Sequence, residues 1–140
     1  MIVVLLLTGI LAAVAIPRFA GRSSFDQLGF LDQTRSAIQF ARKSAVAQRR
    51  NVCVAVAASS ISLTRAMGPG ASAGCAAALP NPATGTAFNL PAPNGVTLAP
   101  ATTLLFDGLG RLASPLAGAS ISVSGIATPI IVERETGYVH

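Results

Sequence analysis

The first sixteen residues are apolar apart from Thr8 and Gly9, and they carry no ionisable side chain. As an α-helix this run would rise about 24 Å, which is less than the roughly 30 Å hydrocarbon core of a bilayer. A secretory signal begins with basic residues, and none precede Ile2, although Ala13 and Ala15 form a small-x-small cleavage pattern. The run therefore leaves three interpretations open: a membrane anchor, a signal cleaved after Ala15, or a buried element of a globular core.

From Ser23 onward, apolar residues recur at helical steps and fall within about 100° of arc on a helix. They are Phe30, Ala37, Ile38, Ala41 and Ala45. This spacing predicts an amphipathic α-helix over residues 23–51 that buries one face against the rest of the domain. With the apolar run before it, the chain is expected to begin with one very long helix.

On a different side of the same predicted helix, five cations lie within a sector about 120° wide. They are Arg35, Arg42, Lys43, Arg49 and Arg50. Leu28 and Val46 project into the same sector, so basic and apolar residues are not fully separated. A basic face attracts nucleic acid or anionic lipid, but cations spread along a helix more often form a solvated face or meet acids. We keep these five residues as a candidate partner-binding face and favour the solvated arrangement.

After Asn51 the periodicity changes from helical to extended. The segments "VCVAVAA" and "ISLTR" are short, rich in β-branched residues and separated by "SS", which predicts two strands joined by a tight turn. Residues 66–100 are rich in Gly and Pro, which predicts a long irregular segment. Strands return in the last third, with a turn at Asp107–Gly110. We therefore expect five to seven short strands over residues 52–140, in an α+β fold whose antiparallel sheet packs on the long helix.

Composition fits one domain with an ample core, because the 140 residues are 51% hydrophobic and 11% charged. Cys53 and Cys75 are the only cysteines and stand 22 positions apart. This is not a zinc-ligand spacing, and the single His140 cannot complete a tetrahedral set. The two cysteines either form one disulfide, worth roughly 3 kcal/mol by loop closure, or are two separate buried thiols.

Polar groups that could converge in an active site are scarce, with one histidine, one tyrosine, no tryptophan and five carboxylates. A Ser-His-Asp triad would have to recruit His140 from the C-terminal end. An acid–base pair of carboxylates is limited to Asp107 with Glu133 or Glu135. The glycines of "GPGASAG" have the wrong spacing for a nucleotide-binding loop. We therefore nominate no catalytic, cofactor-binding or metal-binding residue and expect no enzyme activity.

The segment "IVVLLLTGILAAVAIPRFA" resembles the N-terminal segment of mature type IV pilins and pseudopilins. In that family an apolar run with an internal glycine ends in A-x-P and passes into a long amphipathic helix, and Gly9 and Pro17 stand eight apart as in the family pattern. The family also has a cleaved basic leader, a methylated N-terminus and a glutamate at the fifth mature position. Aligned on Gly9 and Pro17, that glutamate falls immediately before Met1. We therefore expect this chain to be N-terminally shortened, and a chain that starts at Met1 to insert but assemble poorly.

The layout of the whole chain is similar to the H-type pseudopilins of type II secretion and to minor pilins of type IV pili. "FDGLGR", "ISVSG" and "VERETGYVH" look closest to a minor pilin of the mannose-sensitive haemagglutinin (MSHA) pilus type. The resemblance implies a non-enzymatic filament subunit without a cofactor, anchored in the bacterial inner membrane by a single pass. It assigns residues 1–22 to the transmembrane and filament-core half of the N-terminal helix, and residues 23–140 to a periplasmic pilin-like domain.

The implied partners are other pilin or pseudopilin subunits, the inner-membrane assembly platform, membrane lipid, and a prepilin peptidase acting on a leader absent from this sequence. The residues assigned to the membrane and assembly helix are Ile2, Val3, Val4, Leu5, Leu6, Leu7, Gly9, Ile10, Leu11, Ile16 and Pro17.

Two alternatives stay open. Some minor pilins of this broad group bind DNA for uptake through a basic motif near the C-terminus, but the tail "ERETGYVH" has a single arginine, Arg134. Nucleic acid is therefore a partner that we do not favour. A cleaved, soluble periplasmic protein would instead lose residues 1–15.

Overall fold

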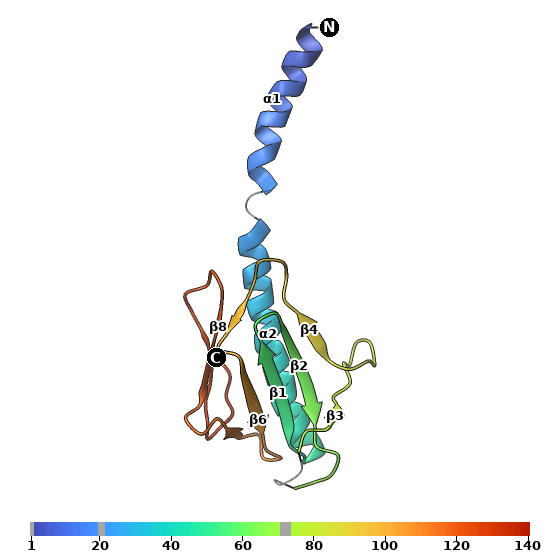
Figure 1. The fold of residues 1–140 in the computed structure, drawn as a ribbon, viewed down its shortest axis with the longest axis vertical. Helices are drawn as coiled ribbons and strands as arrows, with labels where there is room; N and C mark the ends of the chain where they lie inside the picture. Colours follow the sequence, from blue (N-terminus) through green and yellow to red (C-terminus); the bar gives the residue numbers. More distant parts are fainter. Residues whose placement is uncertain (1, 20–21, 71–73) are drawn as a thin grey trace.

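A computed structural model describes residues 2–19, 22–70 and 74–140 of the chain, and the side chains of residues 11–19 and of Arg22 lie outside this description. The chain begins with two helices, α1 (Ile2–Phe19) and α2 (Arg22–Gln48). Figure 1 shows α1 extending away from the rest of the molecule, whereas α2 lies against the strands. The described protein is therefore a projecting helix followed by a globular part built on α2.

The apolar face predicted for α2 is buried. Each of its members is at most 3% exposed, and they are Phe30, Ala37, Ile38, Ala41 and Ala45. Leu28 and Val46, which the helical spacing places outside this face, are exposed. The spacing predicted the buried side correctly, because residues three and four apart share one face of a helix.

α2 ends at Gln48, three residues before the boundary predicted from the sequence. Arg49 adopts a left-handed conformation with a φ of 48°. The N–H of Arg49 donates to the carbonyl of Val46 at 3.3 Å, and the N–H of Arg50 donates to that of Ala45 at 3.1 Å. These two bonds close the last turn as a Schellman motif. Glycine usually occupies the left-handed position of this motif, so an arginine there gave no signal that the helix stops.

The larger sheet is antiparallel, with the strand order β3-β2-β1-β6-β7, and β4 also pairs with β2. Its strands are β1 (Val52–Ala57), β2 (Ser60–Arg65), β3 (Ala77–Ala78), β4 (Asn89–Pro91), β6 (Thr102–Phe106) and β7 (Leu112–Ser114). β1 and β2 form the predicted hairpin, in which Ala57 pairs with Ser60 across a two-residue turn. β1 therefore lies inside the sheet, between β2 and β6.

The smaller sheet has the order β5-β8-β9. Its strands are β5 (Leu98–Ala99), β8 (Ala119–Val123) and β9 (Ile130–Val132). Beyond β9, the backbones of Ile131 and His140 exchange hydrogen bonds of 2.8 and 3.0 Å, so the C-terminal end pairs with β9. Residues of both sheets join the apolar face of α2 in one core.

The described part of the chain thus contains nine strands, whereas the sequence led us to expect five to seven. The difference comes from elements such as β3 and β5, which are two residues long and too short to leave a period in the sequence. The architecture is the predicted α+β arrangement, in which a long helix packs on antiparallel sheets.

Candidate assembly surfaces

The first half of α1 carries an exposed apolar surface, which we call the α1 surface. Its exposed fractions run from 57% at Leu7 to 75% at Ile2. Its members are Ile2, Val3, Val4, Leu5, Leu6, Leu7 and Ile10. Leu11, Ile16 and Pro17 of the predicted assembly helix also lie within α1, but their side chains are outside the description. Exposed apolar surface of this extent is typical of a site that contacts another protein or a membrane.

Thr8 and Gly9 interrupt the α1 surface without adding a free polar group. Thr8 Oγ1 donates to the carbonyl oxygens of Val4 and Leu5, each 3.0 Å away. Because its hydroxyl already makes hydrogen bonds within its own helix, Thr8 can lie in an apolar environment without leaving a polar group unpaired. Gly9 has open space around it. Over the residues that the structure describes, no helix combines the length and the apolar character needed to cross a membrane.

Three of the five cations of the candidate partner-binding face are held by contacts within the domain. They are Arg35, Arg42 and Arg50. Arg42 donates from Nε to the carbonyl of Gly110 at 3.2 Å, and Arg50 donates from Nη1 to that of Met67 at 2.9 Å. Arg35 pairs with Asp32 on the same helix, at 3.6 Å.

The other two cations, Lys43 and Arg49, are exposed. Lys43 lies in α2 three residues before the exposed Val46, whereas Arg49 lies just beyond the end of the helix. The candidate partner-binding face is therefore divided between cations that support the fold and cations that face solvent.

Cys53 and Cys75 form a disulfide, with sulfur atoms 2.06 Å apart and Cα atoms 6.0 Å apart. The sequence had left this pairing open against two separate thiols. Cys53 lies in β1, and Cys75 lies in the irregular segment between β2 and β3. The bond therefore ties that segment to an inner strand of the larger sheet.

A single carboxylate holds the turn between β6 and β7. Asp107 Oδ1 accepts hydrogen bonds from the N–H groups of Leu109 and Arg111, both at 2.9 Å, and Oδ2 lies 3.2 Å from Nε of Arg111. Gly110 supplies the positive φ of 82° in this turn. These contacts present the side chain of Leu109 to solvent, at 74% exposure. We call residues 107–111 the Leu109 tip.

Two crystal structures of the type IV minor pilin FimU from Pseudomonas aeruginosa resemble this chain over most of its length. One has a TM-score of 0.60 and covers 87% of this chain and 90% of the FimU chain. The other has a TM-score of 0.54 and covers 79% and 87%. The chain has the pilin fold. Both structures are 18% identical in sequence to it, so the likeness concerns the fold. No protein-family model matches the sequence, and the comparison with curated proteins also gives no match.

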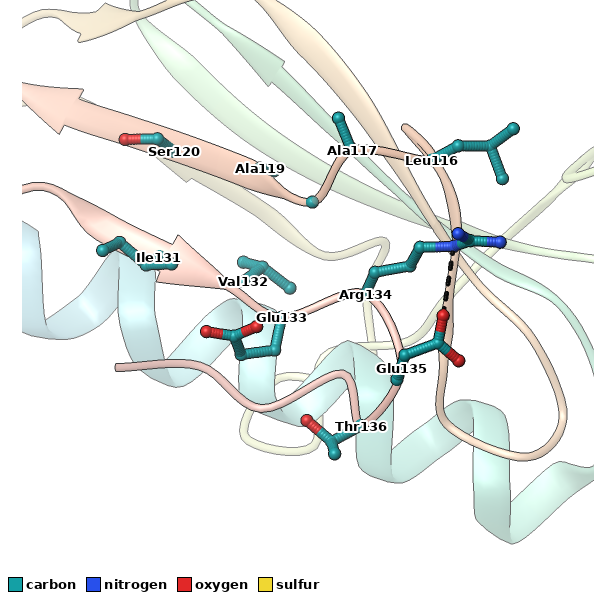
Figure 2. Close-up of a pocket in the computed structure, with 11 residues that line it drawn as sticks. Leu116, Ala117, Ala119, Ser120, Ile131, Val132, Glu133, Arg134, Glu135 and Thr136 are labelled. Carbon is teal, nitrogen blue, oxygen red and sulfur yellow. Dashed lines mark ion pairs between the residues drawn. The ribbon is translucent and has the colours of Figure 1, made fainter.

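Within this pilin fold, the carboxylates considered for acid–base chemistry each have a separate partner. Asp107 is bound in the Leu109 tip, Glu133 Oε1 lies 3.3 Å from His140 Nε2, and Glu135 Oε1 lies 3.5 Å from Arg134 Nε. Figure 2 shows the carboxylates of Glu133 and Glu135 turned in different directions beside a cavity of about 560 Å³. Among the described residues, no three His, Cys, Asp or Glu side chains are grouped as metal ligands.

The sequence did not identify the Leu109 tip as a surface of the pilin fold. Asp107, Gly108 and Gly110 predicted the turn, but the exposure of Leu109 depends on the hydrogen bonds of the Asp107 carboxylate and on Arg42, which reaches Gly110 from α2. One feature of the sequence could have indicated the exposure of Leu109. It is a large apolar residue between two glycines in a predicted turn, and residues in such turns usually lie at the protein surface.

Proposed function

We propose that this protein is a minor pilin or pseudopilin, a structural and non-enzymatic subunit of a type IV pilus or of a type II secretion pseudopilus. The observation that carries the proposal is the α1 surface, which projects from a domain that has a core of its own (Figure 1). An apolar helix of this kind is unfavourable in water and favourable in lipid or against the helices of other subunits. The pilin fold of the domain supports the same assignment.

In this proposal residues 1–22 anchor the chain in the bacterial inner membrane and then enter the filament core, while residues 23–140 form the periplasmic domain. The Cys53–Cys75 disulfide supports a periplasmic domain, because disulfides persist in oxidising compartments. The partners are other pilin subunits, the inner-membrane assembly platform, membrane lipid and a prepilin peptidase.

Within this class we favour a minor pilin of the MSHA type over a type II secretion pseudopilin. The support is the resemblance of "FDGLGR", "ISVSG" and "VERETGYVH" to that group. The set of major subunits that co-purifies with the protein distinguishes the two systems. DNA binding has less support, because three of the five candidate cations make contacts within the domain.

The proposal is tested with the chain carrying a C-terminal tag and expressed from its own gene in the bacterium that encodes it. The substitution Leu6→Arg puts a charge on the α1 surface. A charge at the centre of an apolar helix costs about 2.5–3.5 kcal/mol on membrane insertion. We therefore expect the tagged protein to fall at least about tenfold in both the membrane fraction and the sheared filament fraction, measured by quantitative immunoblot.

Leu116→Arg is the matched control, because Leu116 is 66% exposed and Leu6 is 61% exposed. Leu116 lies in the loop after β7, away from α1, so we expect this variant to reach the filaments at the wild-type level. The proposal is wrong if the unmodified protein is missing from both fractions, or if Leu6→Arg leaves its distribution unchanged.

A further inference from the structure

The turn that joins β4 of the larger sheet to β5 of the smaller sheet contains the dipeptide Asn94–Gly95. The N–H of Val96 donates to the carbonyl of Pro93 at 3.0 Å and closes the turn. Gly95 has a φ of 80°, and a positive φ at the third residue is typical of a type II turn. Asn94 and Gly95 are both exposed. The dipeptide therefore lies at the outer corner of a tight turn, in contact with solvent.

The two groups of this dipeptide that could react with each other are not held by the protein. Among the residues that the structure describes, neither the side-chain amide of Asn94 nor the N–H of Gly95 has a hydrogen-bond partner. A Cβ placed on Gly95 would meet no atom within 4 Å. A surface turn with so few contacts opens at a low free-energy cost. The main chain can therefore rotate at Asn94 until the nitrogen of Gly95 reaches the side-chain amide.

This approach allows the asparagine amide to be lost without an enzyme. The nitrogen of Gly95 attacks Cγ of Asn94, the new C–N bond closes a succinimide ring, and ammonia leaves with the proton from that nitrogen. Water then opens the ring at either carbonyl. One product is aspartate, and the other is isoaspartate, in which the main chain runs through the β-carbon. Glycine favours the attack, because it has no Cβ to crowd its nitrogen and its backbone is the least restricted.

The other three asparagines of the chain differ from Asn94 in their surroundings. Asn51 is 3% exposed and is shielded from water. Asn81 precedes Pro82, whose nitrogen carries no proton. Asn89 is exposed, but it lies in β4 and precedes a leucine. Asn94 is therefore the asparagine whose next residue and exposure both favour the reaction.

Either product changes the connection between the two sheets. Before the turn, the N–H of Ala92 donates to the carbonyl of Ser59 at 2.8 Å. After it, the N–H of Leu98 donates to the carbonyl of Ala58 at 2.9 Å. Isoaspartate adds one carbon to the main chain between these two anchors, and both products put a negative charge where a neutral amide stood. Val96 follows the dipeptide directly and is 5% exposed, so the longer main chain must be accommodated beside a core residue.

We propose that Asn94 is a modification site, at which the Asn94–Gly95 dipeptide of the folded protein converts by itself to aspartate and isoaspartate. The conversion consumes water and releases ammonia, so it progresses with the age of each copy. Older copies then carry an altered connection between the sheets, and newly made copies do not. This inference goes beyond the proposed function and does not depend on it.

The test is to incubate the folded full chain in detergent micelles at mildly alkaline pH, where base removes the proton from the Gly95 nitrogen more readily. Samples taken over time are digested, and mass spectrometry with electron-transfer fragmentation distinguishes asparagine, aspartate and isoaspartate at each position. We expect Asn94 to lose its amide progressively and to give both products. Asn89 is the matched control within the same molecule, because it is also exposed, and we expect it to keep its amide.

The variant Gly95→Asn keeps the turn and hinders the attack. Asparagine tolerates a positive φ, and the open space at Gly95 admits its Cβ, so we expect the turn to form. Its side chain crowds the attacking nitrogen, so we expect Asn94 to lose its amide more slowly than in the wild type.

The chain unfolded in urea measures the same reaction without the turn. If Asn94 converts in urea but keeps its amide in the folded chain, the turn protects Asn94 and the proposal is wrong. The proposal is also wrong if aspartate forms without isoaspartate, or if Gly95→Asn converts as fast as the wild type.

Discussion

At the scale of single residues, Thr34 is a polar side chain inside the interface between α2 and the sheets. It is 0% exposed, and its Oγ1 has no hydrogen-bond partner among the residues that the structure describes. A buried hydroxyl without a partner costs about 1–3 kcal/mol. Valine has a similar shape without the hydroxyl, so we predict that Thr34→Val raises the free energy of unfolding by about 1 kcal/mol. Urea denaturation of the full chain in detergent micelles measures this change.

Thr34→Ala is the control for that substitution. Alanine removes the hydroxyl together with a methyl group, so it leaves a small cavity and is expected to be less stable than Thr34→Val. A urea midpoint for Thr34→Val at or below the wild-type value, with an unchanged slope, would contradict the prediction.

At the scale of elements, local periodicity was enough to predict α2 and the hairpin of β1 and β2. Phe30 and Ile38 recur at helical spacing, whereas Val52 and Val54 alternate along a strand, and all four are buried. Each pattern reports which side of one element faces the core, so nearby residues carry the information. The α1 surface was recognised for a similar reason, because a run without charges needs no tertiary contact to be seen.

The stacking of Phe40 on Phe88 and the position of the Leu109 tip could not be predicted in this way, because they depend on contacts between distant parts of the chain. Phe40 meets Phe88, and Arg42 meets Gly110 at a separation of 68 positions. No period along the sequence records such contacts. The sequence also could not show which cations of the candidate partner-binding face are held within the domain, because the carbonyl groups that bind Arg42 and Arg50 come from other segments.

The disulfide joins an inner strand to a segment with little regular structure of its own. Cys53 and Cys75 are 22 positions apart, and closing a loop of this length stabilises the fold by about 3 kcal/mol. We predict that the double variant Cys53→Ser, Cys75→Ser loses about 3 kcal/mol of unfolding free energy in urea. Wild-type protein in reductant is the matched control and should unfold at the same urea concentration. A double variant as stable as the oxidised wild type would show that the bond does not stabilise the fold.

At the scale of the whole molecule, the net charge of +5 says less about a nucleic-acid partner than the positions of the exposed cations. A protein that neutralises Z phosphates of duplex DNA has an affinity that falls with salt, with a log–log slope of about −0.9Z. The five cations of the candidate partner-binding face acting together would give a slope of about −4.5. Lys43 and Arg49, which are the exposed members of the set, would give about −1.8.

We predict the shallower slope, because Arg42 and Arg50 donate to carbonyl groups and Arg35 pairs with Asp32. The measurement is the fluorescence anisotropy of labelled duplex DNA titrated with the full chain in neutral detergent, between about 50 and 200 mM salt. The double variant Lys43→Gln, Arg49→Gln should abolish the remaining binding, whereas Arg134→Gln is the control that removes a charge outside the candidate partner-binding face. A slope near −4.5 for the unmodified chain that falls only to about −2.7 in the double variant would mean that Arg35, Arg42 and Arg50 exchange their contacts within the domain for phosphate, and it would restore DNA as a partner.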